Sequence, residues 1–262
     1  MTQGSSAVAP QAVRQAVRQA IVLAAGNGDR FRNGSAHSKL LTPVAGTPLL
    51  IRTLTSAHRA GISDAHIVLG YDAEHVRALA ESAAPPDLHL HFHVNHEWYR
   101  ENGVSVLAAR SSIRERAFAL MMGDHIFEPQ VLERLLQEPR TTDEALLCVD
   151  RQTGHRDDPI SEIRATEATK VRLRGDRVTA IGKTLHPYDA LDTGLFVCDP
   201  SVFEALSEAC ASGDSTLSGG IRRLASRGLV RGVDIGSAGW CDIDTVADLA
   251  IAEQLVGAPD RA

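Results

Sequence analysis

The stretch from Ile21 to Arg30, Ile-Val-Leu-Ala-Ala-Gly-Asn-Gly-Asp-Arg, places the strongest constraint on how this chain can fold. A short apolar run passes through two alanines into a glycine-rich turn, which predicts a buried strand leading into a loop. Gly26 and Gly28 have no side chains, so backbone N–H groups there can face an anion. Arg30 and, further along, Lys39 add positive charge. We therefore expect the phosphates of a nucleotide at this loop.

Two other kinds of phosphate-binding loop are excluded. A dinucleotide-binding fingerprint requires a third glycine, or an alanine, where Phe31 stands. A Walker loop requires Gly-Lys and then Ser or Thr after four intervening residues, and the sequence contains no such run. The loop must therefore belong to another class of nucleotide-binding protein.

The length and composition of the chain further limit the class of protein. The 262 residues suit one large α/β domain, and a net charge of −6 argues against a nucleic-acid surface. No apolar run is long enough to span a bilayer, and the first residues lack the hydrophobic centre of a signal peptide, so we expect a cytoplasmic protein. The four cysteines are isolated, which predicts reduced core residues rather than disulfides or a zinc site; they are Cys148, Cys198, Cys210 and Cys241.

Apolar runs alternate with helical patterns from residue 20 onward. This alternation predicts an α/β fold with a Rossmann-like, mostly parallel mixed sheet and helices on both faces. We expect residues 1–18 to be a disordered or weakly helical tail and residues 19–262 to form a single domain. Residues 19–150 would be its nucleotide-binding half and residues 151–262 its acceptor-binding half. Strands are predicted at 20–23, 66–70, 88–94, 118–122, 144–150 and 195–198, with a hairpin around Gly175-Asp176.

Three aspartates are candidate metal ligands. Asp124 follows the predicted strand 118–122, and ligands of such sheets bind beyond the carboxyl ends of the strands. Asp242 and Asp244 face the same side of an extended segment, because side chains alternate along a strand. Carboxylates from distant parts of the chain suit a magnesium ion that bridges phosphates. Capping of a turn or helix is the alternative explanation for Asp124 and for one of the other two.

The first loop, Lys39 and the run Pro43-Val-Ala-Gly-Thr-Pro-Leu-Leu50 together resemble the signature of nucleotidyltransferases that make nucleotide-activated sugars and alcohols. Further motifs resemble the inositol-1-phosphate cytidylyltransferase branch and cover nearly all of the chain in that family's order. They are Asn102-Gly103-x-Ser105, Gly123-Asp124-His125, Asp192-Thr193-Gly194-Leu195-Phe196 and Trp240-x-Asp242-Ile243-Asp244-Thr245. The resemblance implies the fold of nucleotide-diphospho-sugar transferases. One departure is Ser38, where the family usually has proline before the lysine, and this predicts a looser loop.

The resemblance also implies roles for individual residues. Arg30, Lys39 and Lys183 would be catalytic, the first two at the triphosphate. Asp124 and Asp244 would hold Mg²⁺, with Asp242 as substitute or neighbour. His125, Lys183 and Asp192 would contact the acceptor, although a solvated hairpin lysine and a turn cap remain the simpler explanations for the last two. The nucleotide-binding residues would be Leu23, Ala24, Ala25, Gly26, Asn27, Gly28, Asn102, Gly103 and Ser105.

The implied activity is Mg²⁺-dependent transfer of a cytidylyl group from CTP to a phosphorylated small alcohol, with release of pyrophosphate. Inositol-1-phosphate is the first candidate acceptor, and a related phosphate or phosphonate is the second. The attacking phosphate oxygen is already an anion, so the reaction needs no general base. Two alternatives remain: a sugar-1-phosphate nucleotidyltransferase that uses UTP or dTTP, and a non-catalytic nucleotide-binding regulatory protein. The sequence leaves a homodimer open.

Some relatives carry a fused membrane transferase domain. The sequence shows no such domain, so we expect any later phosphodiester-forming step to need another protein.

His89, His91 and His93 alternate along one predicted strand, with His96 close by. Imidazoles on one face can bind a transition metal, but a half-exposed strand with a polar outer face is the simpler interpretation. We expect His125 to orient the site or to contact the acceptor rather than to bind metal.

Overall fold

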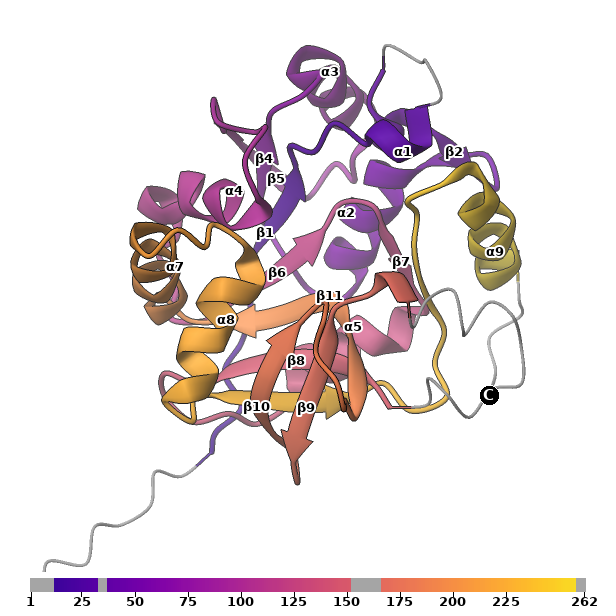
Figure 1. Ribbon diagram of the computed structural model, residues 1–262. Coiled ribbons are helices and arrows are strands. Elements are labelled where there is room, and N and C mark those ends of the chain that lie inside the picture. Colours follow the sequence, from indigo (N-terminus) through magenta and orange to yellow (C-terminus); the bar gives the residue numbers. More distant parts are fainter. Residues whose placement is uncertain (1–11, 33–36, 152–165, 258–262) are drawn as a thin grey trace, which may run out of the picture.

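The computed structural model describes residues 12–32, 37–151 and 166–257 (Figure 1). Its centre is a nine-stranded sheet with the strand order β5-β4-β1-β6-β11-β8-β12-β10-β9. Helices α4, α7 and α8 lie along one side of this sheet, and α2 and α5 lie along the other (Figure 1). This confirms the predicted α/β fold with helices on both faces.

The first half of the sheet is parallel. Strand β1 lies between β4 and β6, and β4 also pairs with β5, all in parallel register. The bounds are β1 Gln19–Ala24, β4 Asp64–Leu69, β5 His89–Val94 and β6 Phe118–Met122. The carboxyl ends of these strands therefore meet at one edge, where the glycine-rich loop and Asp124 follow.

The second half makes the sheet mixed. Strand β11 runs antiparallel to β6 and to β8, whereas β12 is parallel to β8. The bounds are β8 Ala145–Asp150, β9 Lys170–Arg174, β10 Arg177–Gly182, β11 Ala190–Cys198 and β12 Val230–Asp234. The predicted hairpin is present as β9 and β10, and Gly175 takes the left-handed backbone (φ +66°) that this tight turn requires.

Successive side chains of β1 point to opposite faces of the sheet, so the core forms two layers. Val22 packs with α2, α3 and α5, whereas Ile21 packs with α4, α7 and α8. Both side chains are fully buried, which stabilises the fold by about 1.5–3 kcal/mol for each such residue. The helices are α2 Leu49–Arg59, α3 Ala73–Ala83, α4 Asn102–Ala108, α5 Pro129–Gln137, α7 Ser201–Ala211 and α8 Leu217–Ser226.

Several short elements were not predicted, because two to four residues are too few to show a repeating pattern of apolar side chains. Strand β7 (His125–Phe127) pairs antiparallel with β13 (Trp240–Asp242), and the longer helix α9 (Val246–Gly257) follows β13. The loop after β1 contains α1 (Asp29–Arg32), the 3-10 helix η1 (Lys39–Leu41) and the β2–β3 pair (Pro43–Val44 and Thr47–Pro48). A second 3-10 helix, η2 (Arg110–Ser112), follows α4.

Part of the predicted tail lies outside the described residues, which begin at Ala12. Residues 12–18 form no helix: Val13 bridges to Arg140 in antiparallel fashion, and Val17 is buried. The four cysteines form no disulfide with one another. None of the helices in the described ranges has the length and apolar character needed to cross a membrane.

Candidate active site

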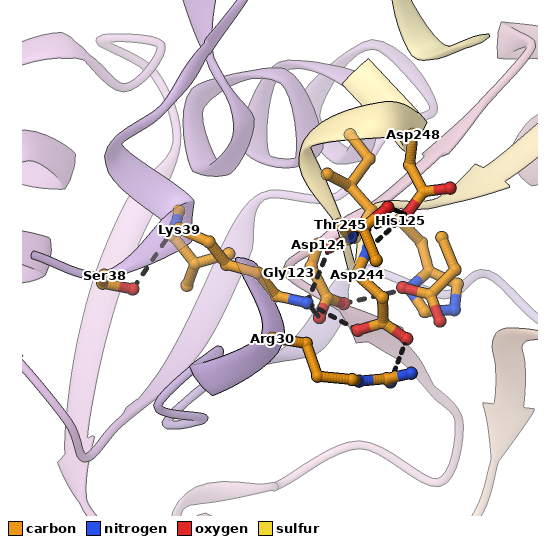
Figure 2. Close-up of polar contacts among 12 residues, drawn as sticks. Arg30, Ser38, Lys39, Gly123, Asp124, His125, Asp244, Thr245 and Asp248 are labelled. Atoms are coloured by element: carbon orange, nitrogen blue, oxygen red, sulfur yellow. Dashed lines mark hydrogen bonds and ion pairs between the residues drawn. The ribbon is translucent and has the colours of Figure 1, made fainter. Parts of the chain in front are cut away.

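Lys39 lies at the centre of a charged cluster at the carboxyl edge of the sheet (Figure 2). Its Nζ lies 2.8 Å from Asp124 Oδ2 and 3.0 Å from Asp244 Oδ1, and it donates to the Ile243 carbonyl oxygen at 2.7 Å. Burial alone would lower the pKa of Lys39, but the carboxylates of Asp124 and Asp244 raise it above its ordinary value. The lysine is therefore a buried, fixed positive charge that joins two distant parts of the chain.

Local hydrogen bonds hold the segment that carries Lys39. Ser38 caps η1, its Oγ accepting from the Leu40 N–H at 3.3 Å, and its own N–H donates to Asp72 Oδ2 at 2.8 Å. The looser loop stays a prediction, while these bonds tie Ser38 to η1 and to Asp72. Proline, which the family usually has here, carries no N–H and could not form the bond to Asp72.

Asp124 and His125 follow β6 directly. Gly123 donates its N–H to the Leu23 carbonyl oxygen at 2.9 Å and accepts from Thr53 Oγ1 at 3.2 Å, which fixes the chain just before Asp124. His125 Nδ1 lies 2.9 Å from Asp124 Oδ1. The sheet edge thus presents a carboxylate and an imidazole side by side.

The pairing of β7 with β13 places Asp242 opposite His125, with 3.6 Å between His125 Nδ1 and Asp242 Oδ1. Burial alone would lower the pKa of His125, but Asp242 and Asp124 raise it to about 9. Burial raises the pKa of Asp242 to about 7; His125 opposes this shift, and Asp124 and Asp244 add to it. For Asp124, burial is outweighed by Lys39 and His125, so its pKa lies below its ordinary range. The two carboxylates therefore favour the protonated form of His125.

These carboxylates fit a divalent cation. Ligand atoms of Asp124, His125 and Asp242 all lie within 4.8 Å of one another. Asp242 Oδ1 is buried and has no hydrogen-bond partner among the described residues, a costly state that a bound cation would relieve. Asp124 and Asp244 face the Lys39 ammonium, which already supplies one positive charge between them. Oxygen donors of this kind are the ligands that Mg²⁺ prefers.

The position of Asp244 depends on a residue that the sequence did not reveal. Asp248 Oδ2 accepts from the Asp244 N–H, the Thr245 N–H and Thr245 Oγ1 at 3.1, 2.6 and 2.8 Å (Figure 2). Asp248 thus caps this end of α9, and the Asp244 side chain pairs with Lys39 instead. The Thr245-x-x-Asp248 spacing of a capping box is the signal that could have found it.

Arg30 reaches the same cluster from the exposed side. Its Nη2 lies 2.5 Å from Asp244 Oδ2, and its Nη1 forms an ion pair with Glu167. Glu167 was not predicted, and no motif marked it. Because both Arg30 and Glu167 are about half exposed, the pair adds little stability, but it aims the guanidinium at the cluster.

The glycine-rich loop packs directly on Lys39. Gly28 has a left-handed backbone (φ +59°), and a Cβ there would lie 3.2 Å from Lys39 Cγ and Cδ. Gly26, in contrast, faces open space, with nothing within 4 Å of the position of a Cβ. The Asn27 amide donates to Asp29 Oδ2 at 2.5 Å. The segment from Leu23 to Gly28 therefore lies beside the charged cluster, as predicted.

Asn102, Gly103 and Ser105 lie at the start of α4 and are tied to other elements. Asn102 Oδ1 accepts from the Leu217 N–H at 2.8 Å, and the Gly103 N–H donates to the Ser215 carbonyl oxygen at 3.0 Å. Ser105 Oγ accepts from the Asn95 amide at 2.9 Å. These bonds join α4 to the start of α8 and to the end of β5, and none of them reaches the charged cluster.

The two candidate acceptor residues differ. Asp192 lies within β11, where the register shifts between Asp192 and Phe196, and its Oδ1 accepts from the Gly194 N–H at 2.8 Å, as a local cap would. Burial raises its pKa to about 6. Gly194 (φ +76°) touches His125, since a Cβ would lie 2.7 Å from His125 Nε2. Lys183 is exposed after β10 and forms no ion pair with another described residue. Asp192 thus reaches His125 through Gly194, whereas Lys183 lies next to Gly182, the strand partner of Lys170, without a hydrogen bond or ion pair to the described residues of the cluster.

A mixed sheet whose carboxyl edge carries a glycine-rich loop, a buried lysine and converging aspartates defines a nucleotidyltransferase-type protein. The MobA-like NTP transferase domain matches residues 20–228, and the chain belongs to that family. The resemblance seen in the sequence is thereby confirmed.

Individual relatives share most of the chain. It is 38% identical over 241 residues to the "Bifunctional IPC transferase and DIPP synthase" of Rubrobacter xylanophilus, covering 90% of this chain and 51% of the relative. It is 39% identical over 126 residues to the "CMP-5'-(3-aminopropyl)phosphonate synthase" of Streptomyces rubellomurinus, covering 47% and 20%. The chain spans about half the length of the first of these relatives, 51%.

Among solved structures, the inositol-1-phosphate CTP transferase from T. maritima superposes with a TM-score of 0.79. The two chains are 24% identical, and the match covers 93% of this chain and 97% of the other. At this identity the likeness shows the fold alone, and the fold is the one that the sequence predicted.

Proposed function

We propose that this chain transfers a cytidylyl group from CTP to a phosphorylated small alcohol in a Mg²⁺-dependent reaction that releases pyrophosphate. The observation that carries the proposal is the position of Lys39 between Asp124 and Asp244, beside the glycine-rich loop. Such a cluster suits phosphoryl chemistry, because catalysis there rests on positioning and charge stabilisation rather than on a covalent nucleophile. A cytoplasmic location fits this reaction.

The choice of substrates follows the relatives. The names of three of them refer to CTP, IPC or a CMP-linked phosphonate. Inositol-1-phosphate is therefore our first candidate acceptor, and a phosphonate or another alcohol phosphate is the second.

The bond changes are simple. An acceptor phosphate oxygen forms a bond to the α-phosphorus of CTP, the bond from that phosphorus to the bridging oxygen breaks, and pyrophosphate leaves in line. The nucleophile is an anion at neutral pH, so no side chain has to remove a proton from it. The difficulty is to bring two polyanions together, and fixed positive charges reduce that repulsion.

This chain's residues divide the work between them. Backbone N–H groups from Leu23 to Gly28 bind the phosphates, while Lys39 and Arg30 neutralise their charge. Asp124 and Asp244, with Asp242 beside them, would hold Mg²⁺, which when bound supplies further charge stabilisation at the phosphates. We assign Asn102, Gly103 and Ser105 to the side of the base.

The acceptor would lie near His125. Asp242 and Asp124 favour the protonated form of this residue, raising its pKa to about 9, and Asp192 lies close to it. We propose that His125 attracts the acceptor phosphate, that Asp192 accepts a hydrogen bond from an acceptor hydroxyl, and that Lys183 meets the phosphate from the exposed side.

The test is pyrophosphate release by the purified chain with Mg²⁺, using CTP, UTP, ATP, GTP and dTTP against alcohol phosphates, phosphonates and sugar-1-phosphates. We expect release with CTP and one alcohol phosphate or phosphonate, its loss in Asp124→Ala, and wild-type rates in Asp87→Asn, an exposed carboxylate away from the site. Release with UTP or dTTP and a sugar phosphate would replace the proposal with that reaction. Nucleotide binding without turnover across the panel would indicate a regulatory protein.

A further inference from the structure

A second group of ligating side chains lies next to the active-site segment but takes no part in the proposed reaction. His75 Nδ1 lies 2.6 Å from Asp72 Oδ1, and His37 Nδ1 lies 3.4 Å from Asp72 Oδ2. The two imidazole rings meet edge to face with their centroids 4.8 Å apart. Ligand atoms of all three residues lie within 4.8 Å of one another.

These residues come from two separate parts of the chain. His37 precedes Ser38 and Lys39, whereas Asp72 and His75 lie at the start of α3. Asp72 has a left-handed backbone (φ +55°), an uncommon conformation that directs its carboxylate back toward the loop. Its side chain is only 9% exposed, and its Oδ2 accepts from the Ser38 N–H. The carboxylate is therefore fixed in place before any ligand arrives.

The ring environment leaves room for an ion. The side chains of His37 and His75 are 58% and 61% exposed, so one side of the cluster is open to water. Two imidazoles and one carboxylate are the donors found in zinc sites with three protein ligands and an open fourth position. Ligands of a tetrahedral ion with bonds of about 2.0–2.1 Å lie roughly 3.3 Å apart, close to the 3.4 Å between His37 Nδ1 and Asp72 Oδ2. The 2.6 Å hydrogen bond between His75 Nδ1 and Asp72 Oδ1 would lengthen as the ion replaces its proton.

We propose that His37, Asp72 and His75 bind a divalent transition metal of the Zn²⁺ class. Imidazole nitrogen favours Zn²⁺ over Mg²⁺, whereas the cluster around Asp124 is dominated by carboxylate oxygens and suits Mg²⁺. The two sites would therefore take different ions. Bound Zn²⁺ would tie the loop that carries Lys39 to α3 through His37.

The row of histidines on β5 is the competing location, but its contacts do not bring three candidate ligands together. His66 Nδ1 lies 3.1 Å from His93 Nε2, and His91 Nε2 lies 3.0 Å from Asp64 Oδ1. Within the described ranges, three candidate ligands converge only around Asp72 and around Asp124. The transition-metal site is thus placed at Asp72 rather than on β5.

The test measures Zn²⁺ binding to the full chain by equilibrium dialysis, with excess Mg²⁺ present to fill the carboxylate cluster. We expect one Zn²⁺ per wild-type chain, and affinity weakened at least about tenfold in His37→Ala and in His75→Ala. His91→Ala and His96→Ala are matched controls that should bind as the wild type does. Co²⁺ in place of Zn²⁺ should give a visible absorption band that both variants lose.

Folding is checked separately. Both rings are largely exposed, so His37→Ala and His75→Ala should melt at the wild-type temperature without metal, and only the wild type should gain stability when Zn²⁺ is added. Three results would each overturn the proposal. The wild type could fail to bind Zn²⁺, or a variant that carries both His37→Ala and His75→Ala could bind it undiminished. Binding could also be lost only in His91→Ala or Asp124→Asn. None of these measurements requires substrate turnover, so the result stands apart from the proposed reaction.

Discussion

The two ends of the parallel strands both bury polar side chains, but they satisfy them in different ways. At the carboxyl ends, Lys39, Asp124 and Asp244 are charged, and Asp242 Oδ1 has no hydrogen-bond partner among the described residues. At the amino ends, Gln19 Oε1 accepts from two backbone N–H groups, so its amide nitrogen faces His66 Nε2 at 3.1 Å. His66 Nδ1 is then left to donate to His93 Nε2.

The hydrogen bonds at the amino ends, which run from Gln19 through His66 to His93, require a neutral His66. Burial, together with His91 and His93, lowers the pKa of His66 to about 4, and protonated Nε2 would point its hydrogen at the Gln19 amide hydrogens. The two ends of the parallel strands are therefore suited to different tasks. The amino end is closed by neutral hydrogen bonds that favour stability. The carboxyl end keeps charges, and Asp242 Oδ1 there has no hydrogen-bond partner among the described residues, so a ligand can complete it.

The largest effect is expected when the central cation of the carboxyl end is removed. Lys39→Ala should lower kcat/KM for pyrophosphate release by about 10²–10³-fold, because a preorganised positive charge at the phosphates is lost. The measurement is steady-state kinetics with CTP and the preferred acceptor. In Lys183→Ala, we expect only a higher KM for the acceptor, so a similar loss of kcat there would reverse the assigned roles.

Replacing the Asp242 carboxylate by an amide should have opposite effects on stability and on activity. Asp242→Asn removes a half-buried carboxylate that lies near Asp124 and Asp244, so without Mg²⁺ it should raise Tm by roughly 2–4 °C, equivalent to about 1 kcal/mol. The same variant should gain less stability from Mg²⁺ and turn over more slowly than the wild type. Thermal melts with and without Mg²⁺ check this, and a lower Tm in both conditions would contradict it.

Acid should act on the amino end through His66. The pKa of His66 is about 4 in the folded protein and about 6.5 when unfolded, so the unfolded state binds the proton more tightly. Stability is therefore complete above pH 6.5 and falls as the pH drops toward 4, by at most about 3 kcal/mol from this group. Urea unfolding across this range should show a shallower pH dependence in His66→Gln, while His96→Ala should follow the wild type.

The smallest effect concerns the segment before Lys39. Ser38→Pro suits the observed φ of −60° but removes the N–H that donates to Asp72, which should cost about 1 kcal/mol of unfolding free energy. Ser38→Ala keeps that N–H and loses only the cap to Leu40, so it should be the milder change. Urea unfolding of the two variants side by side decides which bond matters more.

The sequence was sufficient for the elements with a clear period. The strands 118–122 and 88–94 are long enough to carry a clear pattern, and both were predicted within about one residue of β6 and β5. Strands β7 and β13 were missed because three residues carry no period, and each is stabilised by pairing with the other from a distant part of the chain. Strand β11 begins at Ala190, so Asp192 lies in a strand where a turn was the simpler expectation.

Only part of the candidate site could be predicted from the sequence, because the residues that position it come from distant parts of the chain. The residue types of Lys39, Asp124 and Asp244 made them candidates, because ligands of such sheets bind beyond the carboxyl ends of the strands, and the fold brings all three together. The side chains that position them left weaker signals: Asp72, Glu167 and Asp248 are ordinary surface residue types until the fold brings them to Ser38, Arg30 and Thr245. Their roles depend on tertiary contacts that local sequence does not specify.

The bond between Lys39 and Asp244 spans 205 positions of the chain. During synthesis the glycine-rich loop and β6 leave the ribosome long before β13, and domains begin to fold as they emerge. The lysine can therefore reach its second carboxylate only after β13 has paired with β7. Catalytic competence would then appear as one of the last events of folding, and enzyme activity would report a completed chain rather than a partly folded one.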